Sequence, residues 1–201
     1  MNITDHVALA KQLLRHASCP LSRTASLGIL VGSALPDCNP LTYLSGVPCH
    51  QGLHGHNAEV RGKTIGRLLR RMQWGNAGGF FAGVRLGIAL HYLADAFTYP
   101  HHAYYPGTLR DHLAYERELH REMAEQLRQA NDGNTLSSDD PLTYAADMLS
   151  FYHCCPPSVR TDCRFITTVC RVVFDSVTTV TESEVEVCED PHHDGLVSAC
   201  R

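Results

Sequence analysis

The sequence predicts an all-α protein built as a single compact domain of several helices. Apolar residues recur at helical spacing, as at Ile65, Leu68 and Met72, and that spacing places them on one face of a helix. A chain of 201 residues with 44% hydrophobic and 19% charged residues is ordinary for one domain with a buried core. No internal repeat or low-complexity block divides it.

The first two helices are predicted from apolar stretches in the N-terminal part of the chain. An apolar face indicates a helix over residues 4–16, and a second apolar stretch over residues 25–35 indicates another. Pro36 is expected to end that second helix, because proline has no N–H for a helical hydrogen bond. Residues 37–57 are rich in Pro, Gly, Asn and Cys and predict a long structured loop, a kind of segment that is often functional in a compact domain.

The rest of the chain is predicted to continue as helices separated by turn residues. They cover residues 65–72, 80–98, 108–130 and 158–180, and another opens at Asp139-Asp140-Pro141. Thr108 is expected to cap its helix and Asn131-Asp132-Gly133 to end it. From Glu182 to Asp194 there are six acidic residues and no basic one. We therefore expect the helical domain over residues 1–181 and a solvated acidic tail over residues 182–201.

Charge and cysteine content bear on partners and compartment. The net charge of −4 gives no electrostatic case for a stable nucleic-acid partner, since phosphate binding needs a positive surface. The first residues do not resemble a signal peptide, and no stretch approaches the length of a transmembrane helix. We therefore expect a cytoplasmic protein whose nine cysteines are free thiols, an odd number that excludes complete internal pairing.

Histidines and carboxylates gather in the middle of the chain and predict a metal site. His91 and Asp95 lie four residues apart on one predicted helix, and His112 and Glu116 repeat that spacing on the next, so each pair shares a helix face. His101 lies between the two helices. Zinc prefers such nitrogen and oxygen ligands. The helix around His91 is almost wholly apolar, where an unpaired carboxylate would cost on the order of several kcal/mol, and coordination to a metal removes that cost.

Two other classes of protein could account for a cluster of histidines and carboxylates on helices. A phosphohydrolase of the HD type needs an adjacent His-Asp pair within the helical core, but the only such pair, His193-Asp194, lies in the acidic tail. A non-catalytic, zinc-stabilised binding protein would use the same ligands without hydrolysis. No Gly-x-Ser-x-Gly nucleophile elbow of a serine hydrolase is present.

The run from Leu90 to His102 resembles the metal-binding core of the bacterial zinc-dependent phospholipase C family. The shared pattern is His-x-x-x-Asp, a histidine six residues further on, and then His-x-x-x-Glu. The zinc-dependent fungal nucleases have the same fold. Upstream, the segment from Gly32 to Asp37 looks like the family's Gly-x-x-x-Pro-Asp segment. The resemblance spans roughly residues 4–120 and implies an all-α domain of the phospholipase C and zinc nuclease type.

The resemblance also implies ligands for two or three zinc ions. His91 and Asp95 would hold the first ion with an upstream histidine, for which His56 is preferred over His50 and His54.

The resemblance assigns the remaining ligands to the second and third ions. His101, His112 and Glu116 would hold the second ion, and a third would lie between Asp95, acting as a bridge, and His6. Secreted family members begin, after processing, with a tryptophan whose terminal amine and carbonyl bind the third zinc, whereas this chain begins with Met1.

The function that follows is a zinc-dependent phosphoester hydrolase, a phospholipase C-like phosphodiesterase that uses metal-activated water. Asp37 matches the family's general base or water-orienting residue. A phosphoester small molecule or a phospholipid head group is the expected substrate. A zinc-dependent nuclease or nucleotidase on the same metal core stays open, with Tyr43, Tyr99, Tyr104 and Tyr105 as candidate base-stacking residues.

Overall fold

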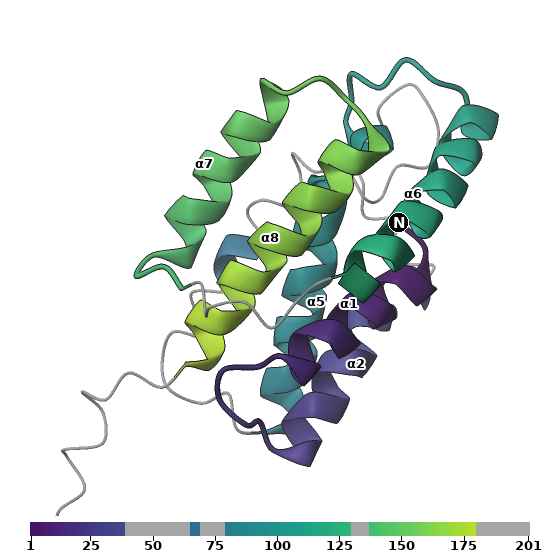
Figure 1. The fold of residues 1–201 in the computed structure, drawn as a ribbon. Helices are drawn as coiled ribbons and strands as arrows, with labels where there is room; N and C mark the ends of the chain where they lie inside the picture. The colour runs from purple at the N-terminus through teal and green to yellow at the C-terminus, as the bar shows by residue number, and fades with distance from the viewer. Residues whose placement is uncertain (39–64, 69–78, 130–136, 180–201) are drawn as a thin grey trace, which may run out of the picture.

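The computed structural model describes residues 1–38, 65–68, 79–129 and 137–179. Within these ranges every regular element is helical, which confirms the predicted all-α class. The elements named are α1 (Ile3–Arg15), α2 (Arg23–Cys38), α5 (Phe80–Ala96), the short 3-10 helix η1 (Tyr99–His101), α6 (Leu109–Gln129), α7 (Pro141–His153) and α8 (Val159–Thr178). Figure 1 shows α8 running between α7 and α6, with α1 and α2 packed beside α5.

Helix α2 continues through Pro36 to Cys38, so the prediction that Pro36 ends this helix is wrong. The proline lies in the last helical turn, where its missing N–H removes a single hydrogen bond and leaves the preceding turns intact. Asp37 therefore sits on a helix instead of opening a loop. The remainder of the predicted loop lies outside the described residues, as do residues 69–72 and the boundary predicted at residue 181.

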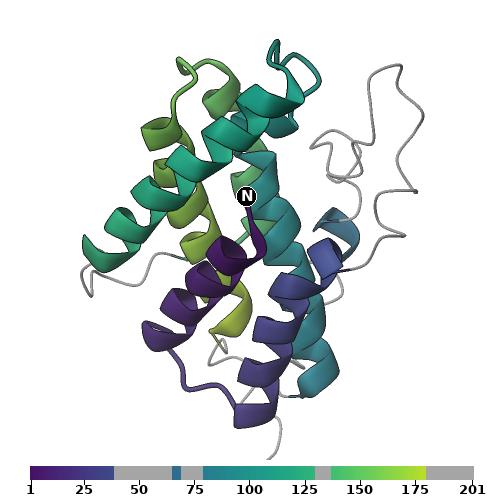
Figure 2. The same ribbon diagram turned by 90° about the vertical axis from the view of Figure 1, so that its right-hand side faces the viewer.

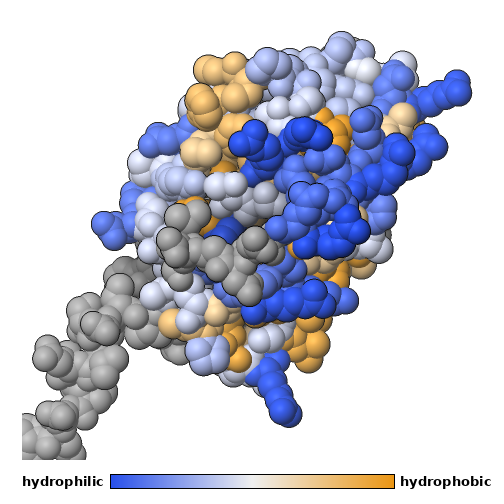
Figure 3. Space-filling model, in the orientation of Figure 1, coloured by the Kyte–Doolittle hydropathy of each residue, from blue (hydrophilic) through white to orange (hydrophobic). Residues whose placement is uncertain are grey.

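The core is made by the inward faces of α1, α5, α6 and α8. Ile166, Val173 and Phe174 of α8 are fully buried, and Leu119 and Met123 of α6 pack in the same cluster. On the outer side, α6 presents a largely hydrophilic surface, visible in Figure 3. Among the described residues, no helix is both long enough and apolar enough to cross a membrane.

Two cysteines of α8 are part of this core. Cys163 and Cys170 have no exposed surface, and they face inward as the helical spacing predicts. Burial raises the pKa of both thiols, which keeps them protonated and unreactive. All six cysteines within the described residues are free thiols.

The backbones of α2 and α5 touch. The contact is formed by two glycine pairs at four-residue spacing, Gly28 and Gly32 on α2 and Gly83 and Gly87 on α5. A β-carbon added to Gly32 would lie 2.2 Å from the Val84 carbonyl oxygen, and one added to Gly87 would lie 2.3 Å from the Ile29 carbonyl oxygen. Only glycine allows two helix backbones to approach so closely.

Gly32→Ser is expected to destabilise the protein, because the new side chain would meet the backbone of α5. Overpacking of this kind costs about 1–3 kcal/mol. The matched control is Gly79→Ser, where an added β-carbon meets nothing within 4 Å and serine is a good residue for the start of α5. Chemical denaturation of both variants measures the difference, and equal free energies of unfolding would contradict the close α2–α5 contact.

Candidate metal centre

His6, His91 and Asp95 form a buried group with metal-ligand spacing. One ligand atom from each lies within 4.8 Å of the others. His6 Nε2 lies 3.3 Å from Asp95 Oδ1, and His91 Nε2 lies 3.3 Å from Asp95 Oδ2. The two imidazole rings stack with their centroids 3.7 Å apart. Helix α5 supplies His91 and Asp95 from adjacent turns, and the first turn of α1 brings His6 against them.

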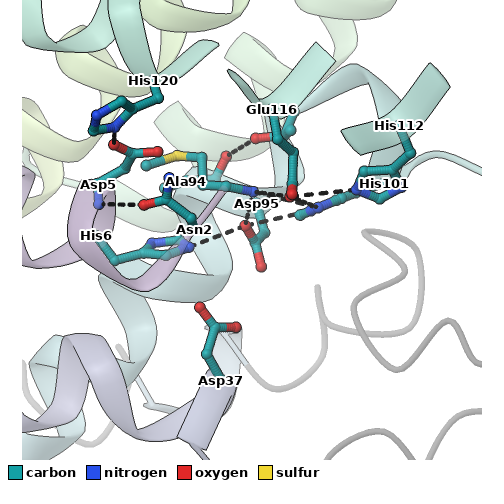
Figure 4. A network of polar contacts seen from close by, with 12 residues as sticks. Asn2, Asp5, His6, Asp37, Ala94, Asp95, His101, His112, Glu116 and His120 are labelled. Carbon is teal, nitrogen blue, oxygen red and sulfur yellow. Dashed lines mark hydrogen bonds and ion pairs between the residues drawn. The ribbon is translucent and has the colours of Figure 1, made fainter. Parts of the chain in front are cut away.

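Helix α2 orients the His91 ring. The His91 Nδ1–H donates a hydrogen bond to the Ser33 carbonyl oxygen at 2.9 Å, because a carbonyl can only accept. This leaves Nε2 as the nitrogen with the lone pair, directed at the carboxylates. The Asp37 Oδ1 atom lies 3.6 Å from that nitrogen. Figure 4 shows the Asp37 carboxylate reaching from the end of α2 toward Asp95.

A second group consists of His101, His112 and Glu116 and is partly exposed. His112 Nε2 lies 3.3 Å from Glu116 Oε1, one turn away on α6, and His101 Nε2 lies 3.9 Å from the same oxygen. His101 also reaches the first group, with its Nδ1 at 3.3 Å from Asp95 Oδ1. Asp95 thus contacts histidines of both groups and lies between them.

The amino group of Met1 is buried and contacts residues of both groups. Figure 2 shows the start of the chain close to α5 and α6. Its nitrogen lies 3.2 Å from Glu116 Oε1 and 3.5 Å from Asp95 Oδ1. The same nitrogen lies 3.4 Å from His101 Nε2. Asp95 raises the pKa of this amine, as does Glu116, and together they outweigh the opposite effect of burial.

The charges of the site are strongly coupled. Burial raises the pKa of Asp95, but His101, the Met1 amino group and His91 outweigh it and hold the pKa well below 3.8. Burial likewise raises the pKa of Glu116, yet hydrogen bonds from His101 and His112 bring it below its ordinary value. Both carboxylates are therefore anions at neutral pH and available as ligands.

The pKa values of His6 and His101 are shifted in opposite directions. Burial and the neighbouring His91 lower the pKa of His6 to about 3, so its ring is neutral. Burial also lowers the pKa of His101, but Asp95 and Glu116 outweigh it and raise the pKa above 6.5. His101 thus keeps a proton under conditions in which His6 has lost its own.

The chemistry of the first group fits a bound cation. Neither ring nitrogen of His6 makes a hydrogen bond to the described residues, although the ring is 2% exposed. A buried polar group without a hydrogen bond costs about 1–3 kcal/mol. Neutral imidazole nitrogens beside an ionised carboxylate form a donor set that zinc accepts, and an ion there would bind one ring nitrogen of His6 together with Asp95.

Most of the site residues predicted from the sequence lie close together in the structure. His6, His91 and Asp95 come together, as do His101, His112 and Glu116, and Asp37 lies beside the first group. The resemblance implies that His6 and Asp95 together hold a third ion, and in the structure His6 contacts Asp95 and His91. His56 and its alternatives, His50 and His54, lie outside the described residues.

Two residues of the site were not predicted from the sequence. Ser33 acts through a backbone carbonyl, which leaves no side-chain signal. Asp5 binds His120 of α6 through the His120 Nδ1 atom and turns away from the two groups (Figure 4). The four-residue spacing from Glu116 to His120 was visible in the sequence, but it does not reveal the partner on α1.

Comparison with protein families gives a match that spans the candidate metal centre. The model of the zinc-dependent phospholipase C family matches residues 5–179, a span that contains both ligand groups and Asp37. The comparisons with curated proteins and with solved structures found no match. The match covers most of the chain and includes every helix described except the first residues of α1. The chain therefore belongs to the zinc-dependent phospholipase C family.

Proposed function

We propose that the protein is a zinc-dependent phosphodiesterase that hydrolyses a phospholipid or a related phosphoester with an activated water molecule. The observation that carries the proposal is the pair of ligand groups joined by Asp95, one of them buried. The proposed ligands of two or three zinc ions are His6, His56, His91, Asp95, His101, His112 and Glu116. Family membership supports the choice of zinc and of a phosphoester substrate.

Zinc bound there would polarise the phosphoryl oxygens and lower the pKa of a coordinated water. The chain's own residues would do the rest. Asp95 holds His6, His91 and His101 in one charge network, which fixes the relative positions of the two groups. Asp37 is part-exposed beside His91. From this position it would orient the attacking water and accept its proton.

An open groove of about 370 Å³ borders the second group at Glu116 and would receive the substrate. It is lined by Asn2, Leu113, Glu116, Arg117 and His120. Glu116 connects it to the proposed ligands. Leu113 offers an apolar contact and Arg117 a positive charge, a combination that suits an amphiphilic phosphoester.

Three of the tyrosines proposed for base stacking pack against one another, and the fourth, Tyr43, lies outside the described residues. The Tyr99 ring lies 5.1 Å from that of Tyr105 and 5.9 Å from that of Tyr104. Tyr104 also stacks on His102, with centroids 4.9 Å apart. These contacts give a structural role to the rings and do not favour a nuclease over a phospholipase C-like enzyme.

Asp95→Asn and Asp37→Asn are expected to differ in whether zinc binding is lost together with activity. Asp95→Asn removes a charge shared by both ligand groups, so it should lose zinc and activity together. Asp37→Asn should keep its zinc and lose turnover by about 10²–10⁴-fold, because it removes only proton transfer. Zinc content by elemental analysis and hydrolysis of an activated phosphodiester measure the two effects.

The matched control is Asp147→Asn, an exposed aspartate of α7 that should change neither quantity. A wild-type rate in Asp37→Asn would show that the base is another residue. Wild-type protein that never met a chelator and holds less than about one zinc per chain would contradict the proposed metal centre. Zinc-loaded protein inert toward every phosphoester would instead support the non-catalytic alternative.

At pH 6.5, the ordinary pKa of histidine, zinc binding is expected to release a proton from His101. The pKa of His101 is raised, and a protonated imidazole cannot bind a metal, so zinc affinity should fall as the pH drops through that value. His6, with a pKa of about 3, is already neutral and should release none. Calorimetric titration with zinc in buffers of different ionisation enthalpy counts the protons released.

Two variants separate the contributions of these histidines. His101→Gln should lower the count of protons released, and His6→Gln should leave it unchanged whatever its effect on affinity. Zinc uptake by the wild-type protein without any proton release would contradict the assignment to His101.

A further inference from the structure

A buried carboxylate outside the ligand groups joins four elements of the fold. Asp162, in the first turn of α8, has no exposed surface. Its Oδ2 atom accepts hydrogen bonds from the Tyr99 backbone N–H at 2.9 Å and from the Tyr115 hydroxyl at 2.8 Å. Its Oδ1 atom accepts one from the Tyr152 hydroxyl at 2.8 Å. The partners belong to η1, α6 and α7.

Two of these partners are neighbours of the second ligand group. Tyr99 opens η1, and the last residue of that short helix is His101. Tyr115 directly precedes Glu116 on α6, one turn after His112. A single oxygen of Asp162 thus holds both segments that carry the second group, although η1 and α6 are separate elements.

The carboxylate is kept there against the cost of its burial. Burial raises the pKa of Asp162 to about 6, while hydrogen bonds from Tyr99, Tyr152 and Tyr115 act in the opposite direction. An apolar side chain of similar size would avoid that desolvation and often stabilises a protein core as well or better. The contribution of Asp162 therefore lies in the placement of its hydrogen-bond partners and not in stability.

We propose that Asp162 is a positioning residue that sets the distance between His101 and the His112–Glu116 pair for zinc binding. It touches none of the three ligands and acts through the Tyr99 backbone and the Tyr115 hydroxyl. The inference rests on the proposed function, since it assigns Asp162 to the second of the two proposed zinc groups.

Tyr115→Phe and Tyr152→Phe form a matched pair that tests this role. Each removes one hydroxyl from the same carboxylate, but α6 carries two of the proposed ligands and α7 carries none. Competition titration of the full-length protein with a chromophoric chelator gives the number and affinity of the bound zinc ions. Tyr115→Phe is expected to weaken one ion by about tenfold, a typical effect for the partners that orient metal ligands. Tyr152→Phe should leave every zinc affinity unchanged.

Two substitutions of Asp162 give an independent readout. Asp162→Leu removes all acceptors and is expected to weaken the same ion by about 10–100-fold. Asp162→Asn keeps an acceptor oxygen and should restore most of the affinity. Thermal unfolding of all four variants separates zinc affinity from stability, since a purely structural role would make affinity follow stability in every variant.

The outcomes distinguish this inference from the proposed function. Equal zinc affinities in Tyr115→Phe and Tyr152→Phe, in a wild-type background that binds zinc, overturn the positioning role alone. A wild-type protein that binds no zinc overturns the proposed function and the positioning role with it. Selective weakening of one ion by Tyr115→Phe, together with rescue by Asp162→Asn, supports the proposal.

Discussion

The direct contact between the backbones of α2 and α5 is the constraint on which the site depends. With glycine at each crossing point, the two helices approach until backbone meets backbone. That approach brings the Ser33 carbonyl to His91 and carries Asp37 to the other side of the same ring. A pair of larger residues at Gly32 and Gly87 would hold the helices further apart. The orientation of His91 thus depends on a backbone contact at Gly87, one helical turn earlier on α5.

The sequence predicted the fold class and the local part of the site because both follow from short-range spacing. His91 with Asp95, and His112 with Glu116, are one helical turn apart, and such pairs share a face whatever the rest of the fold does. His6 was predicted as a ligand only from the family pattern, because the residues next to it in the sequence do not indicate a metal site. The helical class followed from the same apolar periodicity that now forms the core.

The features that the sequence did not predict depend on contacts between distant segments or on backbone atoms. Pro36 was interpreted as a stop, but a proline in the last turn of a helix costs one hydrogen bond that tertiary packing offsets. Asp162 could not be found because its partners are dispersed over the chain, and one of them is a backbone N–H. The spacing of Gly28 and Gly32 did carry a readable signal, since small residues four apart indicate close helix packing.

The two ligand groups differ in how much of the chain must be in place before each exists. His101, His112 and Glu116 come from one short stretch, so η1 and the start of α6 can bring them near one another by local folding, before Asp162 on α8 sets their final distance. His6 reaches Asp95 only after α1 has docked, and this contact closes a longer loop at a larger cost in entropy. A chain that folds in the presence of zinc would therefore bind an ion first at the second group, His101, His112 and Glu116. The docking of α1 would then complete the buried group around Asp95, already anchored on its other side through His101.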